Sequence, residues 1–424
     1  MNERDSETIA GMLTEMGYES TDDKTQADIA IINTCSVRDN ADKRFFGMLG
    51  QLKKQKEKNK NFVSCVCGCM MQQQHIVDEV KQKYPWVDII FGTHNIHKFP
   101  QLLKSVQAEK QRQIDIWNDG MEIIENLPAK RLYKHKAFVN IMFGCNNFCT
   151  YCIVPYTRGR ERSRDPQAII DEVRNLVSQG TKEITLLGQN VNSYRGRDNV
   201  DFADLIYMLN DIEGLERIKF MSSHPKDLSD KLIGAFRDCD RLSNYFHLPV
   251  QSGSDEVLKK MNRHYTASEY LTLVEKLREV RPDIGISTDI IVGFPGETEK
   301  QFEETLELVK KVQYDSAFTF IYSVRKGTPA EKFKEQVDEG AKHDRFNRLV
   351  EEVNRSAAYK NSIFRGRTVS VLVEGVSKNR NDYMTGRSSE NKIVNFKGSR
   401  SLIGTMQEVE ITSSNTFSLM GEMV

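Results

Sequence analysis

Hydrophobic and polar positions alternate over the first hundred residues in a way that predicts helices and strands in turn. In the segment 6–18 the apolar residues Ile9, Met12, Leu13 and Met16 recur at helical spacing, which predicts an amphipathic helix. Three short apolar runs then predict buried strands, with helical patterns between them: 27–33, 62–67 and 87–91 for the strands, 38–55 and 71–84 for the helices. Strands alternating with helices are typical of a parallel sheet, so residues 1–110 are expected to form an α/β domain.

A second pattern of strand, loop and helix begins at Lys136 and repeats six times. The expected strands are 137–143, 183–187, 217–221, 244–248, 285–292 and 316–322, and the helices between them include 166–179, 228–236, 268–280 and 299–312. A charged helical stretch at 331–360 follows. Six such units predict an open, partial TIM-type (β/α)6 barrel over residues 131–360, with its working face at the C-terminal ends of the strands.

The last part of the chain, residues 361–424, changes to short strands separated by turns. These are expected at 368–373, 383–385, 392–396 and 408–413, as in a small β-barrel. Residues 111–130 mix charges with Gly120 and Pro128 and show no strong periodicity, so they are expected to be a linker. The chain as a whole is therefore assigned to the α/β class, with a β-barrel at its end.

Composition narrows the functional classes. The 424 residues carry 60 Lys and Arg against 60 Asp and Glu, so nucleic-acid binding would have to come from local patches. No apolar run approaches the ~18–20 residues of a membrane span, and the charged start of the chain lacks the apolar stretch of a signal peptide. Eight cysteines, mostly clustered, argue against a disulfide framework and favour a reduced, cytoplasmic protein.

Three cysteines stand close together directly after the strand at 137–143. Cys145, Cys149 and Cys152 have the spacing CxxxCxxC, and three neighbouring thiolates suit a soft metal or an iron–sulfur cluster. A structural zinc ion would need a fourth ligand nearby, but residues 153–163 hold no Cys and no His. The alternative is a redox or zinc loop whose last ligand comes from far along the chain.

Two further cysteines, Cys35 and Cys69, each follow a strand of the first domain. Ligand sites of parallel sheets lie off the carboxyl ends of the strands, so both thiols are expected at one metal site. The alternative is that they are ordinary buried thiols, which are common. Cys65 and Cys67 lie within the strand itself, and for them the core position is the favoured interpretation.

Basic residues gather in two places. Arg158, Arg160, Arg162 and Arg164 alternate along the chain after the cysteine loop, and in an extended segment they would project to one side. Phosphate or substrate binding is favoured there over a salt-bridge network with Glu161, Asp165 and Asp171.

The second basic stretch runs from Arg365 to Arg400 and has eight Lys and Arg residues against three Asp and Glu, with Tyr383 and Phe396 among them. This composition suits RNA binding, and the alternative is a solvated β-domain.

The loops that follow the barrel strands carry polar motifs. These are Gly188-Gln-Asn190, Ser222-Ser-His224, Pro249-Val-Gln-Ser-Gly253 and Gly293-Phe-Pro-Gly296. Each alone is equally well a turn. Because all of them fall on the C-terminal face, they are expected to line one site, where glycines allow close approach and amides or hydroxyls bind a ligand.

The CxxxCxxC loop resembles that of the radical S-adenosylmethionine (SAM) enzymes, and the order of the three parts resembles the methylthiotransferases over nearly the whole chain. In that family the last part is the TRAM domain. Long motifs favour the MiaB branch: Cys149-Thr-Tyr-Cys-Ile-Val-Pro-Tyr-Thr-Arg-Gly-Arg-Glu161, His247-Leu-Pro-Val-Gln-Ser-Gly-Ser254, Met261-Asn-Arg-His-Tyr-Thr266, Ser287-Thr-Asp-Ile-Ile-Val-Gly-Phe-Pro-Gly-Glu-Thr298 and Ser323-Val-Arg-Lys-Gly-Thr328.

The resemblance implies conversion of N6-isopentenyladenosine, next to the anticodon of tRNA, into its 2-methylthio derivative. It implies two 4Fe–4S clusters, one on Cys145, Cys149 and Cys152 and one on Cys35 and Cys69. The open iron of the first cluster would bind SAM, and an electron would split SAM to a 5′-deoxyadenosyl radical that takes hydrogen from C2. The second cluster would carry the methylated sulfur. Acid–base catalysis does not suffice at an unactivated C–H bond, so a cofactor radical fits the reaction.

The same resemblance implies the remaining contacts and partners. SAM contacts are expected from Tyr151, Gln189, Gln251, Arg263 and Gly293, and RNA contacts from Arg158, Arg160, Arg162, Arg164, Arg365, Arg367 and Arg387. The expected partners are a tRNA anticodon stem-loop and an electron-donor protein, and neither DNA nor a membrane.

Competing functions remain at this point. The sister branches methylthiolate threonylcarbamoyladenosine in tRNA or a ribosomal protein. A function of a different class is that of a non-catalytic, metal-stabilised RNA-binding protein, which would never cleave SAM.

One departure from the family concerns the second cluster. The family holds it with three cysteines, but here only Cys35 and Cys69 match. The remaining cysteine of the family precedes a segment like Met1-Asn-Glu-Arg-Asp-Ser-Glu7. The sequence therefore predicts an upstream strand that ends in a cysteine. The alternative is that Met1 is the start and that Cys65, Cys67 or a non-protein ligand completes the site.

Overall fold

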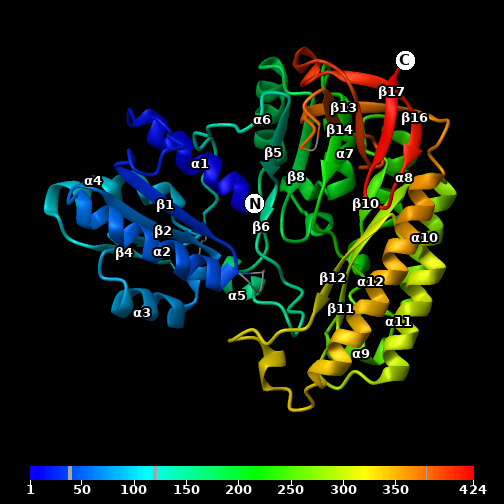
Figure 1. Ribbon diagram of the computed structural model, residues 1–424, viewed down its shortest axis with the longest axis horizontal. Helices are drawn as coiled ribbons and strands as arrows, with labels where there is room; N and C mark the ends of the chain where they lie inside the picture. Colours follow the sequence, from blue (N-terminus) through cyan, green and yellow to red (C-terminus); the bar gives the residue numbers. More distant parts are fainter. Residues whose placement is uncertain (37–40, 118–121, 379) are drawn as a thin grey trace. The chain divides into compact units, whose positions relative to one another are not determined.

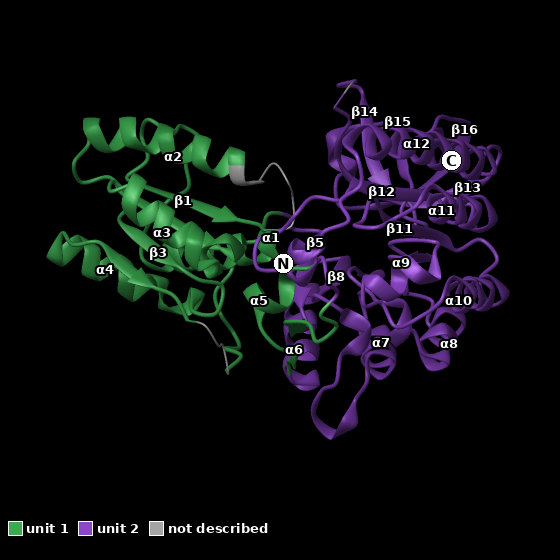
Figure 2. Cartoon of the chain, turned by 90° about the horizontal axis from the view of Figure 1, so that it is seen from below, with its two compact units in different colours: residues 1–132, 142–148, 152–164 green, residues 133–141, 149–151, 165–424 purple. Residues whose placement is uncertain are grey.

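The computed structural model describes residues 1–36, 41–117, 122–378 and 380–424, which form two compact units (Figure 2). Unit 1 comprises Met1–Leu132, Met142–Phe148 and Cys152–Arg164, and unit 2 comprises Tyr133–Ile141, Cys149–Tyr151 and Asp165–Val424. The chain therefore passes between the units several times around the cysteine loop. The predicted domain boundaries are not decided by this division and stay a prediction.

Unit 1 contains a four-stranded sheet in the order β1-β2-β3-β4, and all its neighbouring strands are parallel. Its elements up to residue 115 are α1 (Asn2–Glu15), β1 (Ile29–Thr34), α2 (Ala41–Lys58), β2 (Val63–Gly68), η1 (Cys69–Gln72), α3 (Gln74–Lys83), β3 (Ile89–Phe91), η2 (Ile96–Lys98), α4 (Phe99–Glu109) and β4 (Gln113–Asp115) (Figure 1). The parallel α/β prediction for this region is confirmed.

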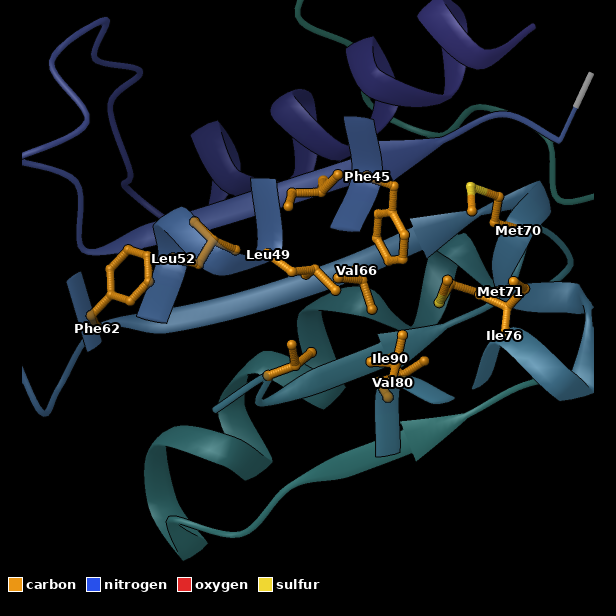
Figure 3. Close-up of a cluster of buried hydrophobic side chains, with 12 residues drawn as sticks. Phe45, Leu49, Leu52, Phe62, Val66, Met70, Met71, Ile76, Val80 and Ile90 are labelled. Atoms are coloured by element: carbon orange, nitrogen blue, oxygen red, sulfur yellow. The ribbon is translucent and has the colours of Figure 1, made fainter. Parts of the chain in front are cut away.

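Helices cover both faces of this sheet because both faces are apolar. On one side, residues of α2 and α3 such as Phe45, Leu49 and Val80 pack on Val66 and Ile90 of the sheet (Figure 3). On the other side, residues of α1 and α4 pack on alternate positions of the same strands, with the cluster Ile9, Met12, Val63, Cys65, Cys67, Ile89, Phe91, Phe99, Leu103 and Val106. A strand buried on both faces reads as a continuous apolar run, which is why these strands are visible in the sequence.

The structure corrects several predicted bounds in unit 1. The helix expected at 38–55 includes residues 38–40, which lie outside the described residues, and α2 runs on to Lys58. The helix expected at 71–84 begins only at Gln74, because Cys69–Gln72 form the separate turn η1. Helix α4 and strand β4 were not predicted, and β4 lies inside the expected linker at 111–130.

Six parallel strands build the partial barrel of unit 2. They form two three-stranded sheets, β5-β8-β9 and β10-β11-β12, which a parallel bridge between Ile218 and Leu242 connects. The strands are β5 (Lys136–Asn140), β8 (Glu183–Leu187), β9 (Arg217–Phe220), β10 (Tyr245–His247), β11 (Gly285–Val292) and β12 (Ser316–Ile321). The helices are α6 (Pro166–Ser178), α7 (Phe202–Asn210), α8 (Asp230–Asp238), α9 (Asp255–Lys260), α10 (Ala267–Val280), α11 (Glu299–Val312) and α12 (Glu339–Ser362) (Figure 1).

Local capping explains why several of these helices were predicted well. Thr298 and Gln301 form a reciprocal capping box at the start of α11, and Thr266 with Glu269 does the same for α10. Short turns η3 (Val191–Ser193), η4 (Arg197–Asn199), η5 (Pro225–Asp227) and η6 (Pro329–Lys332) occupy the loops. The helix expected at 331–360 starts only at Glu339, and α7 and α9 were not predicted.

The predicted strand at 137–143 is interrupted. It divides into β5, which belongs to the barrel, and β6 (Met142–Phe143), which pairs with β7 (Arg162–Ser163) in an antiparallel ribbon of unit 1. Ile141 lies between them, and its N–H donates to the carbonyl of Leu187 at 2.8 Å. The apolar run continued through the break, so periodicity alone could not reveal it.

Residues after α12 form a closed five-stranded barrel in the order β13-β14-β15-β17-β16. The strands are β13 (Thr368–Val376), β14 (Tyr383–Arg387), β15 (Ile393–Lys397), β16 (Met406–Ser414) and β17 (Leu419–Met423), with the turn η7 (Arg400–Leu402). Four of these were predicted and β17 was missed. A small β-barrel at the end of the chain is confirmed.

This small barrel is tied to the N-terminal ends of the parallel strands. Arg217, at the start of β9, donates to the carbonyls of Arg387 and Ser388, and Lys392 forms a buried ion pair of 2.6 Å with Asp315, which precedes β12. The turn between β14 and β15 is thus buried at the end of the parallel barrel that lies opposite its working face.

Among the described residues no helix has the length and apolarity that a membrane crossing requires.

Substitution of Leu49 tests the core of unit 1. Leu49 is completely buried on α2, so Leu49→Ala should lower the free energy of unfolding by about 2–5 kcal/mol, because it removes apolar contacts and leaves a cavity. Met48 on the same helix is 41% exposed, and Met48→Ala is the matched control. Urea denaturation followed by the fluorescence of Trp86 and Trp117, both in unit 1, measures the difference; equal midpoints for the two variants would contradict the packing described.

Candidate functional site

The cysteine loop is a hairpin whose arms are β6 and β7. The N–H of Cys145 donates to the carbonyl of Gly159 at 3.1 Å, and the N–H of Asn146 donates to the carboxylate of Glu161 at 3.0 Å. Gly144 precedes the first cysteine with a positive φ of 78°, and a Cβ at this position would lie 2.0 Å from the carbonyl oxygen of Arg160. Only glycine fits there, so the chain can close tightly behind the cysteines.

The middle of the loop is held within unit 2 through Thr150. Its N–H donates to the carbonyl of Met261, its hydroxyl to the carbonyl of Lys260, and its own carbonyl accepts from the N–H of Ala330. Cys149 is therefore fixed by its neighbour between the end of α9 and the turn η6. Two main-chain hydrogen bonds and one from the Thr150 hydroxyl, rather than bonds between sulfurs, keep this part of the loop in place.

The thiols of the loop suit an iron–sulfur cluster. Cys145 and Cys149 are buried and Cys152 is half-buried, so one short segment offers three soft ligands shielded from solvent. Within the described residues no three His, Cys, Asp or Glu side chains are placed to hold a single metal ion. A four-iron cluster takes one thiolate per iron, so its ligands do not need to converge on one point.

Arg263 contacts the loop from within unit 2. It is buried, and its guanidinium donates to the carbonyl of Pro249 at 2.7 Å, to the hydroxyl of Tyr265 at 2.9 Å and to the Sγ of Cys149 at 3.5 Å. The sequence predicted a SAM contact for this residue. In the structure three of its donors connect the loop after β10 with the cysteine loop, and the SAM contact stays a prediction.

The other four predicted SAM contacts lie in or beside the loops that follow the barrel strands. Tyr151 packs against a buried cluster with Ile291, Gln189 is half-buried after β8, and Gln251 is buried after β10 with a φ of 71°. Gly293 is different, because its N–H already donates to Glu297 and a Cβ would lie 2.4 Å from Lys342. Internal packing alone is thus sufficient to require glycine here, and the SAM contact of Gly293 stays a prediction.

Four of the buried polar atoms without a hydrogen-bond partner lie on the same face of the barrel. Among the described residues, no hydrogen-bond partner is present for Asn190 Oδ1, His224 Nε2, Ser254 Oγ or Tyr322 Oη. These four residues follow β8, β9, β10 and β12 respectively. Burial lowers the pKa of His224, and the nearby Arg263 acts in the same direction, so its imidazole is neutral. Buried polar groups are normally bonded, so this face fits a polar ligand such as SAM.

Cys35 and Cys69 lie side by side in unit 1. Thr34 and Gly68 are register partners at the ends of β1 and β2, and each cysteine is the next residue along its strand. The hydroxyl of Thr34 also donates to the carbonyl of Cys67 at 2.7 Å. The structure therefore brings the two predicted ligands together, and the third ligand predicted to precede Met1 stays a prediction.

Arg158 donates to one of these two thiols. Its Nε lies 3.0 Å from the Sγ of Cys69 and its Nη2 lies 2.7 Å from the carboxylate of Asp5, with all three residues buried. Burial raises the pKa of the Cys69 thiol, and the positive charge of Arg158 opposes this rise. Each predicted cluster site thus contains a buried arginine that donates to a cysteine sulfur.

The predicted row of four arginines on one side of an extended segment is wrong. Arg158 ends the short helix α5 (Val154–Arg158), Arg160 lies over the ring of Phe148, and Arg162 belongs to β7. Arg164 is buried against Glu125 at 2.5 Å. Asp5 and Glu125, the partners of Arg158 and Arg164, lie in distant parts of the sequence, and such partners are invisible in the local pattern. The RNA contacts predicted for these four arginines stay predictions.

Cys65 and Cys67 occupy the core, as the sequence favoured. Both are almost completely buried in the cluster under α1 and α4, and burial raises the pKa of both thiols well above the usual range. Protonated, enclosed thiols are poor metal ligands. The structure therefore gives no support to these residues as substitutes for a missing ligand.

The predicted RNA contacts of the small barrel divide into two groups. Arg365 and Arg367 are exposed just before the first strand of the barrel, near Ser414 and Phe364 respectively. Arg387 instead bonds to the carbonyl of Asn391 and lies 3.9 Å from Glu374, within the junction to the parallel strands. Arg387 is thus used in the packing between the two barrels.

Several site residues were missed at the level of sequence. Asp5 gave no signal, because its partner Arg158 is 153 residues away. The role of Tyr265 as acceptor from Arg263 was also missed. The exposed phenylalanines of β12 gave no signal either, because an apolar run does not show which face of a strand is covered.

Three family models match the chain. A model described as the radical SAM superfamily matches residues 139–309, one described as uncharacterized protein family UPF0004 matches residues 1–92, and the TRAM domain matches residues 364–424. Together they match in the order in which the three parts were predicted.

Curated proteins resemble the chain over its whole length. Proteins named tRNA-2-methylthio-N(6)-dimethylallyladenosine synthase are 55% identical in Clostridium botulinum (strain Alaska E43 / Type E3), 56% in Clostridium tetani and 55% in Clostridium beijerinckii. Each alignment covers 100% of this chain, and 93%, 94% and 93% of the three relatives.

Solved structures share the fold at low identity. The radical SAM methyltransferase TsrM from Kitasatospora setae, with cobalamin and a [4Fe-4S] cluster bound, has a TM-score of 0.58 at 13% identity, covering 77% of this chain and 73% of that one. The cobalamin-dependent SAM radical enzyme OxsB has a TM-score of 0.52 at 13% identity, covering 81% and 53%. These likenesses concern the fold alone.

Substitution of Arg158 tests the buried ion pair. Arg158→Ala leaves the carboxylate of Asp5 buried without a partner, which should lower the free energy of unfolding of unit 1 by about 3–5 kcal/mol. The double variant Asp5→Ala/Arg158→Ala removes both charges and should be more stable than the single variant. Tryptophan fluorescence in urea reports on unit 1, and Lys83→Ala, at an exposed pair with Glu79, should leave the midpoint unchanged. A double variant less stable than Arg158→Ala would contradict this assignment.

Proposed function

This chain belongs to the tRNA-2-methylthio-N(6)-dimethylallyladenosine synthase family, and we propose that it adds a methylthio group to C2 of N6-dimethylallyladenosine (isopentenyladenosine) next to the anticodon of tRNA. Two observations carry the proposal: three cysteines in one loop, whose residues 149–151 are held within unit 2, and four buried polar atoms after the strands of unit 2 that have no partner among the described residues. A hydrolase or a plain RNA-binding protein would not need that combination.

The residues of the radical site divide into ligands and supports. Cys145, Cys149 and Cys152 would hold a 4Fe–4S cluster, which together with SAM supplies a carbon-centred radical able to take hydrogen from an unactivated C–H bond. Thr150 fixes the loop, and Arg263 donates to the Cys149 sulfur and holds the loop after β10 in place.

Polar side chains on the remaining loops would orient SAM. Asn190 Oδ1 is available as an acceptor and His224 Nε2–H as a donor, because their other polar atoms are already used: Asn190 Nδ2 donates to Asp227, and His224 Nδ1 accepts from the N–H of Lys226. Gln189 and Gln251 lie on the same loops. A neutral His224 suits this role, because it adds no positive charge beside Arg263.

A second 4Fe–4S cluster on Cys35 and Cys69 is part of the proposal. It is supported by the placement of both thiols at neighbouring strand ends and by the donor that Arg158 directs at Cys69. Transfer of a methylthio group requires a sulfur site apart from the radical site. The ends of β1 and β2 place Cys35 and Cys69 next to each other, so these two thiols are the candidates for that site.

The anticodon stem-loop is the proposed RNA partner, and an electron-donor protein is the proposed source of reducing equivalents. Exposed Arg365 and Arg367 on the small barrel support the RNA contact, since arginine binds phosphate with paired donors. Because its substrate is tRNA, we propose a cytoplasmic location.

Loss of a loop cysteine tests the enzymatic proposal. Cys149→Ala should reduce reductive cleavage of SAM to the background of protein without iron, because the cluster loses a ligand. Cys239→Ala is the matched control, since Cys239 is also buried but lies at the end of α8 and is no proposed ligand.

In cells that lack the gene, mass spectrometry of tRNA nucleosides should show isopentenyladenosine without its 2-methylthio derivative. Wild-type protein and Cys239→Ala should restore the derivative, and Cys149→Ala should not. Restoration by Cys149→Ala would overturn the proposal.

Charge removal at the small barrel tests the RNA contact. Arg365→Gln/Arg367→Gln should weaken binding of a tRNA anticodon hairpin and reduce the slope of log affinity against log salt by about 2, roughly one for each phosphate contact. Arg355→Gln, at an exposed arginine of α12, should change neither quantity. Deletion of residues 361–424 is a poorer test, because it uncovers Arg217 and Asp315. An unchanged slope in the double variant would exclude these two contacts.

A further inference from the structure

Two phenylalanines stand exposed on the last strand of the partial barrel. Phe318 is 54% exposed and Phe320 is 48% exposed, while the alternate residues of β12 point to the other face and are half-buried. Helix α12 lies along this strand, as Figure 1 also shows. Exposed aromatic side chains cost free energy in water. Two neighbouring exposed rings on one face of a strand therefore indicate a binding surface.

Strand register places these rings on the inner wall of the parallel barrel. Phe318 is paired with Asp289 and Phe320 with Ile291 of β11. The other face of β11, with Ile286, Thr288 and Ile290, is completely buried. In a parallel sheet, register partners share a face, so Phe318, Phe320, Asp289 and Ile291 line the same surface.

This wall adjoins the cysteine loop within unit 2. Ile291, beside Phe320, packs in the same cluster as Tyr151, which follows Cys149 by two residues. Moving along the strands away from that loop, the wall passes through Asp289 and Phe318 to Ser287, the register partner of His247. Phe320 is therefore the ring nearer to the loop, and Phe318 the ring farther from it.

The polar groups beside Phe318 are an acid and an imidazole. His247 Nε2 lies 3.6 Å from the carboxylate of Asp289, its Nδ1 lies 2.8 Å from the hydroxyl of Ser287, and its ring lies 6.0 Å from that of Phe318. Asp289 thus places a negative charge next to the aromatic surface. A substituent with its own carboxylate would meet repulsion there, whereas an apolar one would not.

We propose that Phe318 and Phe320 form the wall that receives the dimethylallyl-bearing adenine, with Phe318 selecting the apolar substituent and Asp289 disfavouring acidic ones. The inference rests on the proposed function and deepens it, by naming the residues that choose the substrate. Two aromatic rings offer stacking surface to the base and apolar contact to the branched five-carbon group. The threonylcarbamoyl group, which carries a carboxylate, is the substituent that this wall rejects.

The test compares binding of three anticodon hairpins that differ only in one adenosine: unmodified, dimethylallylated, or threonylcarbamoylated. Fluorescence anisotropy measures affinity without any chemical step. The wild type should prefer the dimethylallyl hairpin over the unmodified one. Phe318→Ala should lower that ratio by roughly 10-fold, the scale of losing apolar contact with a group of this size. Phe318→Leu keeps an apolar surface and should retain part of the preference. Asp289→Asn should narrow the gap between the threonylcarbamoyl and dimethylallyl hairpins.

Tyr359→Ala is the matched control, because Tyr359 is also 54% exposed but lies on α12. Truncating so exposed a side chain leaves no cavity, and affinity for the unmodified hairpin shows that each variant is folded. A ratio unchanged by Phe318→Ala would overturn the inference, as would an equal change in Tyr359→Ala. If Phe318→Ala instead changed only the oligomeric state in solution, the phenylalanines would form a contact between protein molecules and the inference would be wrong.

The outcome separates this inference from the function on which it rests. Wild-type protein that binds the dimethylallyl hairpin, and methylthiolates it, with a preference that Phe318→Ala leaves intact would overturn the inference alone. Wild-type protein that binds all three hairpins equally and modifies none would overturn the proposed function and the inference together.

Discussion

Main-chain hydrogen bonding around the cysteine loop is the constraint on which the rest of the site depends. Three thiols in eight residues could point in any direction in a free loop. Here the pairing of β6 with β7, the bond from Cys145 to Gly159 and the three bonds of Thr150 fix the backbone before any ligand is bound. Preorganisation of this kind avoids the entropy cost of ordering the loop when it binds a cofactor. The parallel strands then supply the surrounding loops at one end of the barrel.

Buried charge is the second organising feature, and it is costly unless paired. Arg158 and Arg263 are both buried, and both satisfy their donors with oxygen atoms as well as with one cysteine sulfur. Asp5 supplies the counter-charge in one case and the carbonyl of Pro249 an acceptor in the other. A buried guanidinium without such partners would destabilise the fold by several kcal/mol. The charged residues nearest to the thiols therefore contribute to the fold as well as to the site.

The sequence was informative where a local signal decided the outcome. Strands β8 and β11 and helix α11 have the predicted bounds, because apolar runs and a capping box mark their ends. The cysteine spacing likewise identified the loop. The extended arginine row failed because Asp5 and Glu125, the partners of Arg158 and Arg164, lie far away in sequence. The close packing of Gly293 against Lys342 was invisible for the same reason. The aromatic wall of β12 can be recognised only from the pairing register of the strands, and composition does not show that register.

The path of the chain around the cysteines limits how this protein can be divided. Residues 133–141 belong to unit 2, 142–148 to unit 1, 149–151 to unit 2 and 152–164 to unit 1 again. A fragment that ended at residue 132 would lack Arg158, the partner of Asp5, and a fragment that began at residue 165 would lack β5, an outer strand of its barrel. No single cut yields two intact pieces, so these units are not interchangeable modules. A recombination event that transfers either unit to another protein would therefore have to transfer residues 133–164 as well, because this segment alternates between the two units.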